Sequence, residues 1–420
     1  MLDALTSHYP DLTPKKILIL SLVFLYPAAA VIIPHAGGVV LIILVLAGMF
    51  SATGFHKQVM VWEKRVFLVF VLFFVLALVS MLNTENVTMG YERLEKLLQL
   101  PLAYFAYLYL RKSGLDLFPV FVSGLILAAF VLFCTAIIEV FVQGHPRADG
   151  VSYAIFFGDL AVLVSFLILA WVVLSAEVKG LPLYFGMLAS LLGLVAALLS
   201  GTKGALIYIP AGIVVISFFL RHRFSWYRVS RLVIVLLAFM LAAWLLDISG
   251  YGPTARIKSD VAAVTNVEQS SGSTRTRVVL WEIAYSAWRE SPLLGTGLGD
   301  FRQEVLSYFE QLNKKPIRYN QAHSNIMNVM ATMGTVGLIG FLLLSFVPWI
   351  AVAGEKVVDD LLVLKAIVAI VVSAFFVFGL TETWTARNMF MRADIIFVVI
   401  SLCLVFGYKQ KRDTNELSSA

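Results

Sequence analysis

Apolar runs of about 18 residues or more recur along the whole sequence, and they constrain the fold more than any other feature. Such a run can cross a bilayer as a helix, which pairs its own backbone N–H and C=O groups where water is absent. The runs are continuous rather than alternating, so they do not fit a transmembrane β-barrel. Because 60% of the 420 residues are hydrophobic and only 14% are charged, the chain lacks the charge for a soluble surface. The sequence therefore predicts an all-α polytopic membrane protein.

Twelve membrane spans are predicted. They cover residues 17–33, 38–54, 66–82, 94–110, 117–142, 152–175, 182–199, 204–220, 230–247, 324–350, 361–380 and 392–408. The fourth span is the weakest, because its start, YERLEKLLQLP, is amphipathic. The first is expected to be a retained helix, since no small-residue cleavage pattern follows it. Cys134 and Cys403 fall inside spans, so neither a disulfide framework nor a zinc site is expected.

Lysine and arginine residues set the expected orientation, because cytoplasmic loops of membrane proteins are enriched in them. The rich segments alternate with poor ones and contain Lys15/Lys16, Lys57/Lys64/Arg65, Arg111/Lys112, Lys179, Arg221/Arg223/Arg228/Arg231, Lys356 and Lys409/Lys411/Arg412. This pattern, with RHRFSWYRVSR (221–231) as its densest part, predicts that both termini are cytoplasmic. The net charge of +6 is spread over the ends of spans, so no nucleic-acid partner is expected.

The largest segment on the outer side runs from Ile248 to His323 and contains no further span. Long loops in compact proteins are usually functional or disordered, and this one has aromatic residues and an amphipathic helix, so order is expected. The expected organisation is nine helices in residues 1–247, an outer loop domain in 248–322, three helices in 323–408 and a cytoplasmic tail in 409–420.

The stretch STRTRVVLWEIAYSAW in the outer loop predicts a helix that lies along the membrane surface. Arg277, Leu280, Trp281, Ala284 and Trp288 fall on one face of it, and tryptophan suits the membrane interface. An arginine on this apolar face has two explanations. It points either to lipid phosphates or into a cleft that holds an anion.

Several further basic residues lie on the outer side, where the orientation rule predicts few. Arg147 lies in QGHPRADGVSY, Lys203 in the tight turn LLSGTKGAL, Arg275 two residues before Arg277, and Arg387 in TETWTARNMF. If these cations converge, they favour an anion site. A diphosphate is such an anion, since arginine can bind its oxygens in pairs and lysine adds a point charge.

The glycine-rich stretch SPLLGTGLGDF, which follows the amphipathic helix, resembles a dinucleotide-binding fingerprint only in spacing. The fingerprint requires a preceding strand and a βαβ unit, and neither is predicted here. The glycines are expected to let the backbone turn tightly after Pro292 ends the helix. Acidic residues of the outer loop are scattered and no metal-binding motif occurs, so the expectation is that the protein uses neither a metal nor another cofactor.

His323 stands at the outer mouth of the tenth span. A histidine with a pKa near neutrality can take a proton from a hydroxyl and pass it on, but it can also simply form a hydrogen bond at a helix start. Gly334, Gly337 and Gly340 follow at three-residue spacing, which permits close helix packing. Such packing would hold the mouth of the span rigidly, as a positioned base requires.

The pattern of His323-Ser324, nine residues, Gly334 and Gly337 resembles the H-[S/N/Q]-x9-G-x-x-G motif of the lipopolysaccharide O-antigen ligase family. Arg277-x3-Trp281, followed by SPLLGTGLGDF, is similar to the R-x3-W…P-x-x-G-x-G-x-G stretch of that family. The twelve spans and the single large outer loop agree with it as well. The resemblance covers essentially the whole chain.

This resemblance implies a GT-C-like fold and a glycosyltransferase in a Gram-negative inner membrane, with its active site and loop domain in the periplasm. The implied donor is O-antigen polysaccharide on undecaprenyl diphosphate, and the implied acceptor is a sugar hydroxyl of lipid A–core. The implied reaction uses neither a metal nor a nucleotide sugar.

By the same resemblance His323 is the catalytic residue that activates or orients the acceptor hydroxyl, and Arg277 faces the diphosphate. Lys203 occupies a position where family members often carry arginine, a departure that keeps the charge but weakens paired hydrogen bonding. Arg147 and Glu382 match basic and acidic residues of the family more loosely. The candidate site residues are His323 for catalysis; Arg277, Arg275, Lys203 and Arg147 for the donor diphosphate; and Glu382, Arg387 and Trp281 in support.

Other functions remain open from the sequence. An O-antigen polymerase or a protein O-oligosaccharyltransferase would use the same donor with another acceptor. A lipid-linked glycan flippase or transporter would also be polytopic, but ionisable residues should lie midway through its spans. The main interior candidates here, Glu139 and Asp159, lie near span ends.

Overall fold

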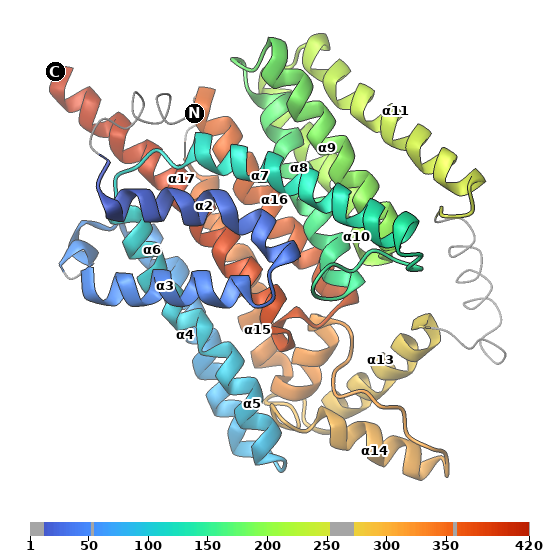
Figure 1. Cartoon of the computed structure of the whole chain (residues 1–420). Helices are drawn as coiled ribbons and strands as arrows, with labels where there is room; N and C mark the ends of the chain where they lie inside the picture. The colour runs from blue at the N-terminus through green and yellow to red at the C-terminus, as the bar shows by residue number, and fades with distance from the viewer. Residues whose placement is uncertain (1–11, 52–53, 253–272, 356–358, 420) are drawn as a thin grey trace.

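The computed structural model describes residues 12–51, 54–252, 273–355 and 359–419, and every regular element in these ranges is helical (Figure 1). Ten of the helices, some with a short continuation, are long and apolar enough to cross a membrane. They are α2 (Pro14–Ile32), α4 (Val61–Ser80), α7 (Phe118–Ile137), α8 (Ala154–Leu174), α9 (Gly180–Ser200), α10 (Lys203–Leu220), α11 (Trp226–Ile248), α15 (Asn325–Ala353), α16 (Asp359–Thr381) and α17 (Asn388–Ser419). The prediction of an all-helical polytopic membrane protein is confirmed.

The two other predicted spans, 38–54 and 94–110, correspond to shorter helices. The first is α3 (Ala36–Ser51), with 16 residues. The second is α6 (Gln99–Lys112), which follows directly on the amphipathic helix α5 (Val87–Leu97). Helices α3 and α6 pack so closely that a side chain at Gly48 would collide with the backbone carbonyl of Phe105. The two short helices therefore form a pair.

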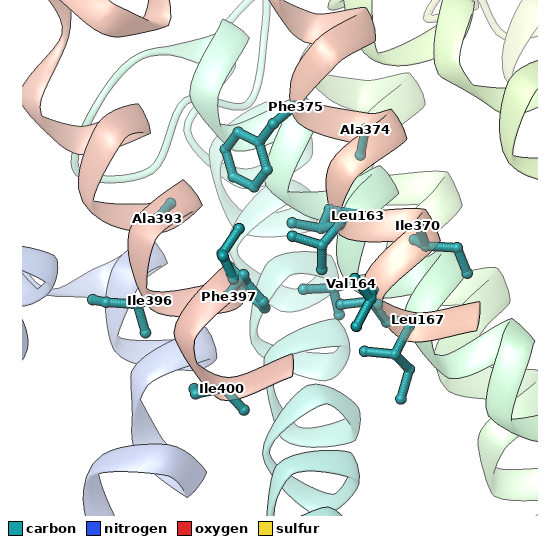
Figure 2. Close-up of a cluster of buried hydrophobic side chains, with 14 of the residues drawn as sticks. Leu163, Val164, Leu167, Ile370, Ala374, Phe375, Ala393, Ile396, Phe397 and Ile400 are labelled. Atoms are coloured by element: carbon teal, nitrogen blue, oxygen red, sulfur yellow. The ribbon is translucent and has the colours of Figure 1, made fainter. Parts of the chain in front are cut away.

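The core lies between α8, α16 and α17. In the most apolar stretch of each helix, 94% of the residues are buried in α8 and 89% in α17. In α11, at the edge of the bundle, only 17% are buried. Figure 2 shows side chains of the three central helices in contact; they are Leu163, Val164 and Leu167, then Ile370, Ala374 and Phe375, and Ala393, Ile396, Phe397 and Ile400. Branched apolar side chains on every face are what a fully surrounded helix requires.

Polar contacts connect the loops with one another at each of the two ends of the bundle. At one end, ion pairs and hydrogen bonds join segments that the sequence predicts to be cytoplasmic: Glu63 with Arg111, Arg111 with Gln410, and Glu355 with Lys409. At the other end, contacts join segments predicted to be outer: Arg147 with Ser200, Asp300 with Glu85, and His323 with Glu382. The predicted sorting of the loops agrees with these contacts; which end faces the cytoplasm stays a prediction.

The outer loop forms two further helices, α13 (Ser273–Glu290) and α14 (Phe301–Gln311). Leu280, Ile283 and Ala284 of α13 pack on Phe301 and Val305 of α14 in a small separate core. Helix α13 ends shortly before Pro292, as predicted. The predicted loop domain is described only in part, since residues 253–272 lie outside the described ranges.

Helix α15 is broken at Gly334, which has φ 65° and ψ −164°. A break frees backbone groups that a membrane helix must pair again. The glycine-rich loop after α13 supplies the partners: the carbonyls of Pro292 and Leu293 accept from the amides of Thr335 and Val336, at 2.8 and 3.2 Å. The amides of residues 296 and 297 also donate to the carbonyls of residues 331 and 332, so four backbone hydrogen bonds close the gap.

The same joint reaches α4 and α5. The hydroxyl of Ser80 donates to the Thr332 carbonyl at 2.7 Å, and the buried carboxylate of Asp300 accepts from the amides of Glu85 and Asn86 at 2.8 and 2.7 Å. A carboxylate at the start of α5 also suits the helix dipole. The loop between α13 and α14 therefore fixes the outer domain to α15 and to the start of α5, and Ser80 fixes the same part of α15 to α4.

The prediction that the three glycines of α15 serve helix packing is correct at one position and wrong at another. A side chain at Gly340 would collide with Leu76 of α4, so this glycine permits close packing. Gly334 instead interrupts the helix, because the loop 292–297 occupies the space against it.

We predict that Gly334→Ala lowers the free energy of unfolding by about 1–3 kcal/mol or more, because alanine resists positive φ. Its methyl group would also collide with the Leu293 carbonyl. Thermal unfolding of the purified chain in detergent measures this. Gly354→Ala is the control, since Gly354 has φ −73° and open space around its Cβ position. Equal melting temperatures for both variants would contradict the assignment.

Candidate functional site

His323 lies at the head of α15 in a backbone conformation that side chains rarely adopt, with φ 50°. Ser324 is the N-cap of the helix, and its hydroxyl accepts from the Met327 amide at 3.5 Å. The imidazole packs edge-on against the ring of Tyr319, with 5.1 Å between ring centroids. Strained residues of this kind are kept where the surrounding structure holds them, and they concentrate at functional sites.

Glu382, directly after α16, holds the imidazole of His323. Its side chain is fully buried, and Oε2 lies 3.3 Å from Nδ1 of His323. Oε1 accepts from the Thr383 amide at 3.0 Å and from Nε2 of Gln321 at 3.3 Å. Nε of Arg387 lies 3.6 Å from the same oxygen. A buried carboxylate with this many donors is fixed in position.

The environment of Glu382 keeps its carboxylate ionised. Burial alone would raise its pKa, but the hydrogen bond with His323, the charges of His323 and Arg387 and the Thr383 amide together lower the pKa below its ordinary value of 4.5. An ionised carboxylate selects the imidazole tautomer with hydrogen on Nδ1. The other ring nitrogen, Nε2, is then free to accept a proton, and 13% of the His323 side chain remains exposed.

The turn that carries Lys203 lies at the same end of the bundle. Arg147 donates from Nε to the Ser200 carbonyl at 2.7 Å and from Nη2 to the Thr202 hydroxyl at 3.3 Å. The next residue, Lys203, opens α10. Two of the four predicted donor-binding cations are therefore neighbours, and Arg147 holds the turn in place.

The Lys203 turn is close to the pair of His323 and Glu382. A side chain at Gly204 would collide with the hydroxyl of Thr381, which directly precedes Glu382, and would come within 3.9 Å of Oδ1 of Asp159. Asp159 is 1% exposed, and neither oxygen has a hydrogen-bond partner among the described residues. It lies within electrostatic range of both Glu382 and Arg277.

Helix α13 carries Arg277 at the same end of the bundle as His323. Nε1 of Trp281, one turn further along, donates to the Ala322 carbonyl at 3.1 Å, directly beside His323. Nε1 of Trp288 donates to the hydroxyl of Thr335 at 3.1 Å. Both tryptophans therefore bind α15 or the segment before it, and Arg277 on the same face is partly buried, which favours the second of the two explanations for this arginine, a cleft that holds an anion.

Arg275 and Arg387 differ in their relation to the site. Arg275 is exposed and lies about 200° around α13 from Arg277, so the two side chains leave the helix in different directions. Arg387 contacts Glu382, and its guanidinium lies 5.1 Å from the ring centroid of Tyr153.

Sequence reasoning missed Arg93 on α5. Its Nη2 donates to the Asn320 carbonyl at 2.9 Å and its Nη1 to the Ala386 carbonyl at 3.4 Å, so it joins the two segments that carry His323 and Glu382. Burial and the charge of Arg387 lower the pKa of Arg93 to about 10, which leaves it charged at neutral pH. The available signal was one more arginine in an outer segment expected to have few.

Within the described ranges, no group of three or more His, Cys, Asp and Glu side chains is arranged to hold a metal ion. The arrangement offers instead an oriented imidazole beside several cations. Chemically, such a site can take a proton from a hydroxyl and stabilise negative charge on a phosphate.

Comparison with known proteins agrees with these features. Residues 188–342, from α9 through the outer loop to the broken part of α15, match the family model described as O-Antigen ligase. This match supports the family that the motifs around His323 predict. A curated protein of Haemophilus influenzae, described as uncharacterized, is 24% identical over 209 residues, 48% of this chain. The chain spans about half the length of that relative, 51%.

We predict that ionised Glu382 stabilises the fold. Because its pKa is lowered in the folded chain, this stabilisation is complete above the ordinary pKa and is lost as pH falls through the folded value. Thermal unfolding measured from about pH 6 to about pH 3 should therefore fall less steeply in Glu382→Gln than in the unaltered chain. Glu310→Gln, at an exposed position, serves as the control. A Glu382→Gln curve parallel to the unaltered one would contradict the prediction.

Proposed function

We propose that this chain, as a member of the O-antigen ligase family, transfers O-antigen polysaccharide from undecaprenyl diphosphate to a sugar hydroxyl of lipid A–core. The family match supports a glycosyltransferase of the ligase or polymerase type. The proposed location is the inner membrane of a Gram-negative bacterium, with the site facing the periplasm. Both substrates are lipids, so a site at the end of a membrane bundle lets them enter sideways from the bilayer.

The observation that carries this proposal is the pair of His323 and Glu382 at the end of the bundle where outer cations gather. Glu382 is buried and ionised, and it orients an imidazole that keeps one nitrogen available. This is the arrangement that a general base requires: a proton acceptor fixed by a second group.

In the proposed reaction Nε2 of His323 takes the proton of the acceptor hydroxyl as its oxygen attacks the anomeric carbon of the donor. A new glycosidic bond forms, and the bond from that carbon to the diphosphate breaks with its electron pair. Undecaprenyl diphosphate leaves, and the imidazolium later returns its proton to water. Glu382 acts as a positioning residue, and its negative charge stabilises the imidazolium while the proton is held.

The leaving diphosphate gains negative charge, and nearby cations lower the energy of that state. Arg277 and Lys203 are proposed to contact it, with Arg147 holding the Lys203 turn and Arg275 and Arg387 at the margin of the site. Lys203 also lies in the first turn of α10, where the backbone amides of an 18-residue helix favour an anion. A diphosphate is already a good leaving group, so these charges can serve without a metal.

The acceptor distinguishes the alternatives. An O-antigen polymerase would use a second lipid-linked glycan, and a protein O-oligosaccharyltransferase would use a protein hydroxyl. A flippase or transporter would move the lipid-linked glycan without breaking its diphosphate bond. Purified chain with lipid-linked glycan and rough-type lipopolysaccharide tests the proposal: lipopolysaccharide that gains mass supports a ligase. Transport in proteoliposomes without any product would exclude all the transferase functions.

We predict that His323→Ala abolishes attachment of polymer to lipid A–core while the chain stays folded and inserted. Loss of a general base lowers rates by about 10²–10⁴-fold. Gel mobility of the lipopolysaccharide product measures the transfer, and the thermal unfolding curve reports the fold. His222→Ala, at an exposed histidine of the opposite end, is the control. Normal ligation by the His323 variant would remove this residue from the mechanism.

For Arg277 we predict that replacement by alanine weakens donor use more than replacement by lysine, because lysine keeps the charge and loses the paired hydrogen bonds. The apparent KM for the lipid-linked donor should rise, and the KM for the acceptor should change little. Arg289→Ala, at an exposed position on the same helix, is the matched control. Equal activity of the unaltered chain and both Arg277 variants would count against a diphosphate role.

A further inference from the structure

A basic cavity of about 470 Å³ lies at the opposite end of the bundle from His323, where the α8–α9 turn meets the α10–α11 turn. Its lining includes Lys179, Arg223, Phe224, Tyr227, Arg228 and Arg231. Four of these are cations, and among its described lining residues none is Asp or Glu. Glu177 in the same turn lines a neighbouring cavity instead. Figure 1 shows the start of α11 at the end of the bundle away from α13 and α14.

Arg231 forms the fixed floor of this cavity. It is 3% exposed, and its terminal nitrogens donate to the backbone: Nη1 to the Val172 carbonyl at 2.6 Å and Nη2 to the Val178 carbonyl at 3.1 Å. These bonds hold the end of α8 and use two of the three guanidinium nitrogens of Arg231. The third, Nε, is buried with no hydrogen-bond partner among the described residues. A charged donor left in this state requires a partner.

The other cations are held at the same opening. Nη1 of Arg228 donates to the carbonyl of Arg223 at 3.0 Å, which fixes the Arg228 guanidinium beside the Arg223 backbone. Arg228 lies within electrostatic range of Arg223 and Arg231, and an anion between these like charges removes their repulsion. Lys179 approaches from the α8–α9 turn, so the cations come from two loops that are distant in sequence.

The start of α11 adds a second source of positive potential. Ser225 is the N-cap, and its side chain makes no capping hydrogen bond. The amide of Arg228 already donates to the Ser225 carbonyl, and the two helix amides before it are the ones that lack an acceptor within the helix and can face an anion. A helix start, a buried arginine with a spare donor and further cations around one cavity together form a phosphate-binding geometry.

Aromatic side chains around the opening indicate what carries the phosphate. Phe224, Trp226 and Tyr227 are 61%, 77% and 56% exposed. Aromatic residues of this kind lie at the level of lipid headgroups. Beyond them, α11 presents exposed apolar side chains such as Leu237 and Met240, which suit acyl chains. The opening thus joins a polar cavity to a lipid-facing helix.

We propose that this cavity binds the phosphate headgroup of an anionic membrane phospholipid. The proposal differs from the general attraction of basic loops to anionic membranes, because the cations surround one cavity and one of them is buried. It does not rest on the proposed transferase function. Lys203 and this cavity lie at the two ends of α10, about 27 Å apart by the rise of an 18-residue helix.

Lipid binding to the purified full chain in a neutral detergent tests this, with native mass spectrometry as the readout. The probes are phosphatidylglycerol, phosphatidylcholine with the same acyl chains, and inorganic phosphate as a competitor. Arg228→Gln should weaken phosphatidylglycerol binding about fivefold, and Arg223→Gln/Arg228→Gln about 25-fold, because each basic residue contributes about 1 kcal/mol near such a surface. Phosphatidylcholine binding should not change.

Arg221→Gln is the matched control. Arg221 lies in the same turn and carries the same charge, but it stacks on the ring of Phe218 and does not line the cavity. If Arg228→Gln does not fold, Arg228→Lys replaces it and should weaken binding less than fivefold. Equal weakening by Arg221→Gln and Arg228→Gln would overturn the proposal in favour of diffuse attraction. Displacement of the lipid by low-millimolar phosphate would overturn it in favour of a soluble phosphate ligand.

Discussion

The structure depends on how backbone polar groups are paired where α15 breaks in apolar surroundings. Gly334 leaves the helical path, and the loop 292–297 replaces the lost partners with four backbone hydrogen bonds. An unpaired backbone group in a low-dielectric environment costs several kcal/mol, so the break and the loop require each other. The two glycine motifs, far apart in the sequence, are therefore the two halves of one joint. The outer helices α13 and α14 are fixed to the bundle through it.

The functional site is built on top of that joint. Trp281 of α13 binds the carbonyl beside His323, and Asp300 binds the start of α5, whose Arg93 holds the segments on either side. The backbone just before His323 is thus held by Trp281 and Arg93, and the imidazole itself by Glu382. A base that must meet a lipid-borne hydroxyl gains from this rigidity, because small displacements of a catalytic group cost large factors in rate.

The fold was largely predictable, because spans, their order and the sorting of loops follow from hydropathy and charge. The local motif at His323 and the end of α13 before Pro292 were also predictable from the sequence. What periodicity could not give was three-dimensional pairing. A glycine that permits helix packing and one that breaks a helix look alike in a sequence, as Gly340 and Gly334 do. The partner of Trp281 and the bridging by Arg93 depend on which helices are neighbours, and two such pairs are separated by more than 200 positions.

Helix α10 also has a consequence for the surroundings of the protein. One end carries the turn of Lys203, and the other leads into the arginine-rich turn at residues 221–223. A helix is a stiff rod, so the vertical separation between the two charged ends is nearly constant. A bilayer that is thicker than this rod must thin locally, whereas a thinner bilayer makes the bundle tilt, and either response costs a fraction of a kcal/mol per ångström. The length of the lipid chains therefore affects the depth of the His323 imidazole relative to the headgroups at its end of the bundle.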